Sequence, residues 1–341
     1  MPGVQISRAS SDVVAAIDVD ALACRTYSSN HASTRVFVED ITTFNPRRML
    51  KEVPYSKNVD LMVVCAPCQP FSNQNRHKGN DERANLILQA ARFAKVLKPS
   101  GILFENVPGI GSAGVLESLR MALEKVGYHV GRPLRVNAAD LGVPQRRIRC
   151  VMFAARSAAA VRRFEEADFA LGSKTVADAI GQLRPLASGE HDPVDPLHRA
   201  RTHSAVALRR LSAIPRNGGS RDALPEELQL ACHKDRRGYP DVYGRMGWDD
   251  VAPTLTTGCT DITRGRFAHP EQDRAITLRE AALLQSFPPD YVFHGNGSQI
   301  ATQIGNAVPV AMVRAMVPTI VGALTMKTPS RQRRSEMESR P

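Results

Sequence analysis

The sequence predicts an α/β fold, in which an open and mostly parallel sheet is covered by helices on both faces. Short apolar runs alternate with helical patterns through the first half of the chain, which is typical of strand–helix–strand units. Several of these runs end in acidic residues. From about residue 175 to 270 the periodicity weakens and Arg, Pro, Gly and His become frequent, which predicts a second, smaller and loop-rich domain.

Each expected element has a simple sequence signal. The strands are short apolar runs, expected at 13–20, 36–41, 59–67, 101–107 and 148–155. The helices show apolar residues at helical spacing, and Lys-Pro or glycine ends two of them. They are expected at 21–30, 82–99, 115–127, 277–287 and 307–326.

Polar residues follow several of the expected strands. They are Asp18, Asp20, Asp40, Cys68 and Glu105. In open α/β sheets, ligands bind at the carboxyl ends of the strands. We therefore expect these five side chains to lie along one edge of the sheet and to form the functional site.

The composition favours a nucleic-acid partner. Among the 341 residues, 45 Lys and Arg exceed 34 Asp and Glu, giving a net charge of +11 and a pI near 9.7. The six cysteines are too scattered for a disulfide framework or a tetrahedral zinc site. The N-terminus lacks the apolar core of a signal peptide, and the apolar C-terminal stretch carries Arg314 and Pro318. We expect a reduced, cytoplasmic, nucleoid-associated protein without a metal or membrane anchor.

The expected domain organisation is discontinuous. Residues 1–174 form a catalytic and cofactor-binding domain, and 175–270 form the basic, loop-rich domain. Residues 271–326 return to the first domain. The polar and charged tail, 327–341, is expected to be disordered.

The segment CAPCQPFS, beginning at Cys65, admits two interpretations. A C-x-x-C pair after a strand is similar to a thioredoxin-like redox site, but a basic second domain has no use in such an enzyme. Cys65, inside the apolar run, is interpreted as a packing residue. Cys68 lies between Pro67 and Pro70, which restrict the backbone on both sides, and this favours a rigid loop presenting a nucleophile.

Several motifs together resemble the DNA (cytosine-5)-methyltransferases of bacterial restriction–modification systems. The resemblance extends from about residue 13 to 325, and the motifs occur in the order found in that family. They are PCQPFS at 67–72, FENV at 104–107, GVPQRRIR at 142–149, RAITLREAALLQSFP at 274–288 and QIGNAVP at 303–309.

The resemblance implies a Rossmann-like S-adenosylmethionine-dependent methyltransferase sheet with a smaller target-recognition domain. It implies that the Cys68 thiolate attacks carbon 6 of a flipped-out cytosine and that Glu105 supports the ring near N3. Carbon 5 then takes the methyl group of S-adenosylmethionine. Arg147 and Arg149 match arginines that line the pocket of the flipped base.

Further roles follow from the same resemblance. The residues expected to bind the cofactor are Asp18, Asp20, Asp40, Pro67, Asn306 and Val308. Those expected to contact DNA are Gln69, Ser72, Gln145, Arg264 and Arg266. A segment that organises the recognition domain in the family is matched by Arg274, Thr277, Arg279 and Glu280. Thr277 and Glu280 also have the spacing of a helix capping box, so a structural role is equally open.

One departure from the family pattern concerns the start of the chain. The family opens with a strand and a glycine-rich F-x-G-x-G-like loop. In this chain, residues 1–12 contain a single glycine, Gly3. We expect the first strand and this loop to be missing, through a start codon assigned too late, a second chain or a truncated gene product. Two other functions therefore stay open: methylation of cytosine in tRNA, and an inactive homologue that only binds DNA. The expected active form is a monomer that acts on double-stranded DNA. A cognate restriction endonuclease is expected as a functional counterpart that does not form a complex with it.

Overall fold

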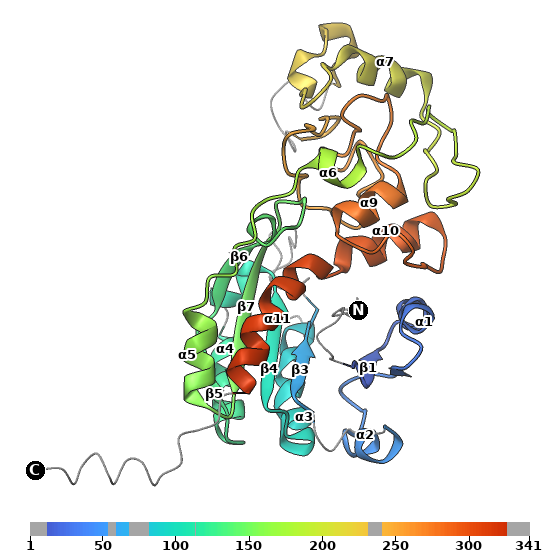
Figure 1. Ribbon diagram of the computed structural model, residues 1–341. Helices are drawn as coiled ribbons and strands as arrows, with labels where there is room; N and C mark the ends of the chain where they lie inside the picture. Colours follow the sequence, from blue (N-terminus) through green and yellow to red (C-terminus); the bar gives the residue numbers. More distant parts are fainter. Residues whose placement is uncertain (1–11, 54–58, 68–81, 113, 231–240, 326–341) are drawn as a thin grey trace, which may run out of the picture. The chain divides into compact units, whose positions relative to one another are not determined.

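The computed structural model describes residues 12–53, 59–67, 82–112, 114–230 and 241–325 (Figure 1). The chain divides into two compact units. Unit 1 comprises Met1–Thr43, Val136–Arg149 and Phe169–Ala315, and unit 2 comprises Phe44–Arg135, Cys150–Asp168 and Met316–Pro341. Each unit is described by itself below.

A five-stranded mixed sheet forms the centre of unit 2. Its strands are β3 (Leu61–Val64), β4 (Gly101–Asn106), β5 (His129–Val130), β6 (Leu134–Asn137) and β7 (Ile148–Ala155). The order is β3-β4-β7-β5, with β6 pairing to β7. β3 and β4 are parallel, whereas β7 runs antiparallel to both β4 and β5. The sheet is therefore mixed, although the sequence predicted a mostly parallel one.

Helices surround this sheet because its central strands are apolar on both faces. They are α2 (Arg47–Glu52), η2 (Glu82–Leu88), α3 (Gln89–Leu97), η3 (Pro108–Ser112), α4 (Val115–Glu124) and α5 (Ala158–Glu165). Ile102 and Phe104 of β4 share one buried cluster with Leu119 of α4. Successive strand residues face opposite ways, so Phe153 of β7 packs on the other face, against Phe164 of α5 with ring centroids 4.9 Å apart. The prediction of helices on both faces is confirmed.

Gly101 allows close packing at the start of β4. A Cβ there would lie 2.9 Å from the side chains of Leu324 and Phe153. The helix expected at 82–99 is also present, as a 3-10 turn followed by α3. It ends at Lys98, whose φ of 50° is left-handed, directly before Pro99.

The N-terminal part of unit 1 is a parallel strand pair joined by a helix. The elements are β1 (Ala15–Asp18), α1 (Ala21–Asn30) and β2 (Arg35–Val38), close to the ranges that the sequence predicts. The end of α1 is fixed by Asn30, which exchanges hydrogen bonds with the backbone of Val292 at 2.7 and 2.9 Å. The backbone N–H of His294 donates to the Thr26 hydroxyl at 3.0 Å. The 291–294 segment therefore packs onto the N-terminal strand–helix pair.

The rest of unit 1 is mainly helical and irregular. Its elements are η4 (Ala138–Asp140), α6 (Val176–Ile180), α7 (Ala205–Ala213), η5 (Arg221–Ala223), η6 (Glu226–Leu228), α9 (Leu278–Leu284), α10 (Gly297–Asn306) and α11 (Val310–Leu324). Among the described residues between 169 and 325, the only β-structure consists of isolated β-bridges. The predicted loop-rich character is therefore observed between the helices. α10 and α11 together are long and apolar enough to cross a membrane, but 61% of their most apolar window is buried in the protein, as in a core helix.

The two units cut the chain at other positions than the expected domains do. Residues 175–270 lie within unit 1, together with 271–315 and the N-terminal strand pair. The boundary between the units also falls inside α11, at Ala315. The expected functional domains at 1–174, 175–270 and 271–326 stay predictions, and the expected disorder of 327–341 lies outside the described residues.

Candidate active site

The segment expected to supply the nucleophile lies at the edge of the described part of unit 2. Pro67 is described and half-buried, three residues after β3. Cys68, Gln69 and Ser72 lie outside the described residues, so their roles stay predictions.

The described thiols are poor candidates for a nucleophile. Burial raises the pKa of Cys150 to about 11 and that of Cys259 to about 12, with the carboxylate of Glu105 adding to the effect at Cys150. Burial, assisted by Glu105, also raises the pKa of Cys65 far above its usual range, and burial raises that of Cys24. A thiol with a raised pKa is protonated at neutral pH and is a weak nucleophile. This agrees with the packing role predicted for Cys65.

Glu105 and Asn106 lie at the carboxyl end of β4, beside the end of β3. The two strands are parallel, so their ends meet at one edge of the sheet. Asn106 is buried, and its Nδ2 donates to the backbone oxygen of Ala66 at 3.1 Å. Its Oδ1 accepts from the backbone N–H of Val107 at 2.9 Å. The bond to Ala66 holds the chain directly before Pro67 next to Glu105. Asp18 lies in the separate two-stranded sheet β1–β2 and Asp40 follows it, so the expectation that all five side chains share one edge of one sheet is wrong.

Asn106 is a positioning residue that the sequence reasoning missed. In the sequence it is visible as a second polar residue at the end of an apolar strand, directly after the acid of the FENV motif. An amide is suited to this place because it both donates and accepts, which satisfies two backbone groups at once.

In unit 1, two predicted cofactor residues lie at adjacent strand ends. Asp18 ends β1 in register with Val38 of β2, and the backbone N–H of Glu39 donates to the backbone oxygen of Asp18 at 3.0 Å. Asp40 follows β2 and is exposed. The backbone N–H and the hydroxyl of Thr42 donate to its carboxylate and lower the pKa of Asp40, so this group is ionised at neutral pH. The two acids therefore lie at the same edge of the β1–β2 pair.

Asp20 has a clear local function as the N-cap of α1. Its Oδ1 accepts from the backbone N–H groups of Leu22 and Ala23 at 2.9 and 3.1 Å. The Oδ1 of Asp18 accepts from the backbone N–H of Asp20 at 2.9 Å. The geometry therefore favours Asp18 over Asp20 as the ligand of a ribose, which is the order that the sequence gave them.

The other predicted cofactor residues lie at the end of α10. Asn306 is the last residue of this helix and is exposed, whereas its neighbours Gly305 and Ala307 are buried. Val308 is 6% exposed and packs in the interior. Only Asn306 of these residues presents its side chain to the surface.

Arg147 and Gln145 are buried and bind protein groups of the same unit. The Nη2 of Arg147 donates to the backbone oxygens of Gly305 and Ala307 at 2.8 and 3.1 Å, and its Nη1 donates to that of Leu255 at 2.9 Å. Gln145 is fully buried and donates through Nε2 to the side-chain oxygen of Gln285 at 2.5 Å. Its Oε1 accepts from the backbone N–H of Leu255 at 3.0 Å.

The amide of Gln145 is used inside the protein on both its donor and its acceptor side. The DNA contact expected for Gln145 stays a prediction. Arg149 is 9% exposed and its Nη1 donates to the backbone oxygen of Ile148 at 2.7 Å. The roles expected for Arg147 and Arg149 beside the flipped base stay predictions.

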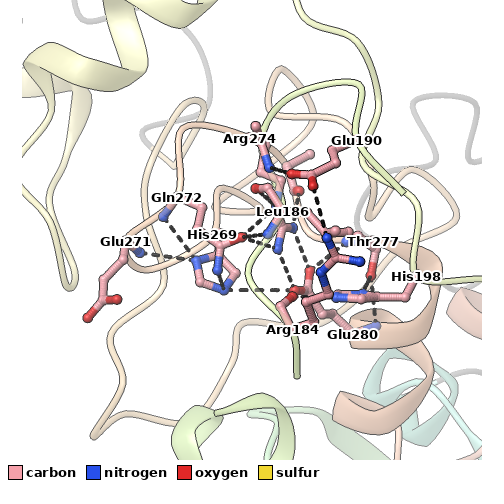
Figure 2. A network of polar contacts seen from close by, with 12 residues as sticks. Arg184, Leu186, Glu190, His198, His269, Glu271, Gln272, Arg274, Thr277 and Glu280 are labelled. Atoms are coloured by element: carbon pink, nitrogen blue, oxygen red, sulfur yellow. Dashed lines mark hydrogen bonds and ion pairs between the residues drawn. The ribbon is translucent and has the colours of Figure 1, made fainter. Parts of the chain in front are cut away.

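A second buried polar network lies in the segment expected to organise the recognition domain (Figure 2). The guanidinium of Arg274 donates to both carboxylate oxygens of Glu280, at 2.8 and 2.7 Å. Thr277 and Glu280 form a complete capping box at the start of α9, so the structural role that the sequence left open is present. Nδ1 of His198 lies 3.0 Å from the hydroxyl of Thr277.

The protonation states in this network follow from burial and from Arg274. Burial alone would raise the pKa of Glu280, but its bonds to Arg274 lower it below its usual range, so the carboxylate is ionised. Burial lowers the pKa of His269 to about 4, although Glu280 opposes this shift. His269 is therefore neutral, and its Nδ1 accepts from the backbone N–H groups of Glu271 and Gln272.

The family of C-5 cytosine-specific DNA methylases matches residues 4–322. The chain belongs to this family. It is a DNA (cytosine-5)-methyltransferase, and the curated proteins that it resembles include type II restriction–modification methylases.

The similarity extends along nearly the whole chain. It is 38% identical over 318 residues to the type II methylase M.HgiDII of Herpetosiphon aurantiacus, covering 90% of this chain and 88% of that protein. It is 31% identical over 320 residues to the type II methyltransferase M1.HphI of Haemophilus parahaemolyticus, covering 92% and 82%.

Solved structures support the same fold. A crystal structure described as a DNA modification methyltransferase encoded within a prophage of E. coli superposes with a TM-score of 0.69, at 20% identity, covering 92% of this chain and 93% of that one. The S. pombe Dnmt2 methyltransferase superposes with a TM-score of 0.58, at 19% identity, covering 92% of both chains. At these identities the likeness concerns the fold, which confirms the α/β methyltransferase class.

The two arginines expected to contact DNA in this methyltransferase differ in how they are held. The Arg264 side chain is 65% exposed and lies 3.9 Å from the carboxylate of Asp261. Arg266 is 26% exposed, pairs with Asp241 at 3.1 Å, and donates through Nη1 to the backbone oxygens of Gly218, Gly219 and Arg245. The structure thus gives Arg266 a structural role within the loop-rich region, whereas Arg264 remains accessible.

Proposed function

We propose that this enzyme transfers a methyl group from S-adenosylmethionine to carbon 5 of cytosine within a specific sequence of double-stranded DNA. The observation that supports it most is the edge formed by β3 and β4. There, Asn106 donates to the backbone oxygen of Ala66 and so holds the chain directly before Pro67 at the strand end that carries Glu105, which supports a proposed nucleophile at Cys68. A nucleophile and a carboxyl group at adjacent strand ends are the two groups that activation of a cytosine ring needs.

The chemistry proceeds on the cytosine ring. The thiolate of Cys68 forms a bond to carbon 6, and the electron pair of the 5,6 double bond moves into the ring. Glu105 stabilises the charge that develops at N3 by hydrogen bonding or by giving a proton. Carbon 5, now nucleophilic, would take the methyl group as the bond from the donor's sulfonium sulfur to that methyl breaks and S-adenosylhomocysteine leaves. Carbon 5 then loses its own proton to a base while the bond between the Cys68 sulfur and carbon 6 breaks. The thiolate is regenerated and the double bond restored.

S-adenosylmethionine supplies the methyl group when bound. Asp18 and Asp40, side by side at the ends of β1 and β2, suit the ribose hydroxyls and the adenine amino group, because carboxylates accept hydrogen bonds from both. Asn306 presents a further donor and acceptor from the end of α10. The donor set is therefore appropriate for a nucleoside with a polar amino-acid part.

The substrate is proposed to be duplex DNA with the target base flipped out. Extrusion of a base costs about a few kcal/mol of stacking and pairing, and binding energy from the phosphates can offset it. The net charge of +11 and the exposed Arg264 in the loop-rich region are consistent with this. We further propose that the enzyme acts as a monomer in the cytoplasm, with recognition by 175–270, and shares its target sequence with a restriction endonuclease.

Bisulfite sequencing of DNA from cells expressing the chain tests this function. Wild type should protect cytosines within one short sequence, and Cys68→Ser should protect none. Cys65→Ser is the matched control, because the same substitution three residues earlier changes a packing thiol and should leave methylation in place. Unprotected DNA with the wild type, or full protection with Cys68→Ser, would refute the proposal.

A further inference from the structure

We propose that Gln285 is a positioning residue for the methyl-donor site, because it fixes the end of α10 from which Asn306 projects. The inference rests on the proposed use of S-adenosylmethionine at Asn306. Gln285 belongs to none of the residues that the motifs assign to the cofactor or to the target base. Its side chain is fully buried, directly after the last residue of α9.

The amide of Gln285 binds the terminal carbonyls of α10. Its Nε2 donates to the backbone oxygens of Ile304 and Ala307 at 2.9 and 2.8 Å. Arg147 donates to the oxygens of Gly305 and Ala307, so three backbone carbonyls around Asn306, those of residues 304, 305 and 307, receive buried donors. The carbonyl of Ala307 accepts from both side chains.

The hydrogen bonds from Gln285 and Arg147 supply partners for carbonyls at the end of α10. The last carbonyls of a helix have no partner within it, and a buried carbonyl without a partner is destabilising. The positive guanidinium of Arg147 is also favourable at this end of the helix dipole. The segment 304–307 is thus held by side chains at a place where a helix end would otherwise fray.

Gly305 shows how little room this segment has to move. A Cβ at Gly305 would lie 2.4 Å from the carbonyl carbon of Thr256, so the two backbones are in direct contact. On the other side of the amide, Gln285 accepts from Nε2 of Gln145, which fixes its orientation. Because Gly305 and Ala307 are both buried and bonded, the exposed Asn306 side chain between them starts from a fixed backbone.

The amide at position 285 therefore controls where Asn306 can meet the methyl donor. Gln285→Met keeps the length of the side chain and removes its Nε2 donor, so the carbonyls of Ile304 and Ala307 each lose one hydrogen bond and keep those from the Ala307 backbone N–H and from Arg147. Loss of one or two hydrogen bonds at a positioning residue corresponds to about a tenfold change in an equilibrium constant. The effect should concern binding of the methyl donor and not the thiol chemistry.

Isothermal titration of the full-length protein with S-adenosylmethionine tests this. Wild type is titrated first, and absence of binding would overturn the proposed function and this inference with it. With binding established, Gln285→Met should raise the Kd about tenfold. In steady-state methylation, the KM for S-adenosylmethionine should rise while kcat at saturation changes less than twofold.

The matched control is Gln299→Met, which removes the capping bond from the backbone N–H of Asn296 at the other end of the same helix. It loosens the same helix at its other end and should leave the Kd unchanged. Equal Kd values for Gln285→Met and wild type, or an equal rise for both variants, would refute the inference.

A double-mutant cycle with Asn306→Ala separates positioning from general damage. If Gln285 acts through Asn306, adding Gln285→Met to Asn306→Ala should raise the Kd by less than twofold, whereas full additivity would contradict the proposal. Should Gln285→Met not fold, Gln145→Met serves in its place, because it removes the donor that orients the Gln285 amide. It is expected to raise the Kd about threefold, and an unchanged Kd would again overturn the inference.

Discussion

The edge formed by β3 and β4 in unit 2 and the polar core of unit 1 hold their polar side chains in different ways. At the edge, Glu105 and Asn106 are placed by strand register over an apolar core that contains Ile102 and Phe104. In unit 1, where the described residues between 169 and 325 form no extended strand, Arg274 and Glu280 hold the chain by a buried ion pair.

The difference teaches what each region tolerates. A sheet distributes its stability over many backbone bonds and apolar contacts, so each side chain contributes a limited share. A loop-rich region has few backbone bonds, and buried guanidiniums such as Arg245 satisfy several carbonyls at once. Removing one such group leaves several buried polar atoms without partners. We therefore expect the largest single losses of stability in unit 1.

Arg274→Met should cause the largest loss. It leaves the carboxylate of Glu280 buried and unpaired, which costs about 3–5 kcal/mol of unfolding free energy. Calorimetry of the variant should show a transition lowered by several degrees. The double variant Arg274→Met with Glu280→Gln should recover part of the loss, since no charge is then left unpaired. If Arg274→Met alone is as stable as wild type, the buried ion pair does not hold the loop-rich region as we describe.

Phe153→Ala tests the apolar contribution in the sheet. Phe153 is 1% exposed and packs against Phe164, so truncation should cost about 3–4 kcal/mol through lost burial and a cavity. Val63→Ala in the same sheet is the control, because Val63 is 44% exposed and should change the urea midpoint little. A Phe153→Ala loss under about 1 kcal/mol would show that the sheet core is not packed as described.

His269 makes the stability of unit 1 depend on pH. Its folded pKa of about 4 lies below the usual 6.5, so the unfolded chain binds the proton more tightly and stability is lost as pH falls from 6.5 towards 4. When the pH falls from 7 to 5, this difference in pKa lowers the free energy of unfolding by about 2 kcal/mol. Urea unfolding of His269→Gln should show a weaker dependence over this range than wild type does. An identical dependence would contradict a neutral buried imidazole.

Asn106→Ala should have the smallest effect on stability, about 1–2 kcal/mol, but a clear effect on methylation. Without the bond to Ala66, the chain leading to Cys68 is no longer held at the end of β4, and the rate at saturating substrates should fall at least about tenfold. Asn30→Ala in unit 1 is the control, since this amide also binds two backbone groups and has no part in the edge. If both variants lower the rate equally, the positioning role of Asn106 is wrong.

The sequence located the longer strands because they are continuous apolar runs, but it did not predict the antiparallel pairing of β7. β4 and the helices α1 and α3 lie close to where periodicity and capping residues place them. The short strands β5 and β6 were missed, since two to four residues show no period. In unit 1 the motifs identified Arg147 and Glu280 as important, but their partners lie up to 160 residues away. Such contacts, including those of Gln285, arise from tertiary packing. In the sequence they are visible only as an isolated polar residue within an apolar run.

The covalent step at Cys68 is the central claim, and trapping it is the most direct test. A DNA duplex carrying 5-fluorocytosine at the target position found by bisulfite sequencing is incubated with wild-type protein and S-adenosylmethionine. Fluorine at carbon 5 cannot leave as a proton does, so the bond between sulfur and carbon 6 should persist. Mass spectrometry of the digested complex should find the nucleotide on the peptide containing Cys68, attached to that residue. Absence of an adduct on a methylated target, or an adduct on Cys65, would contradict the account.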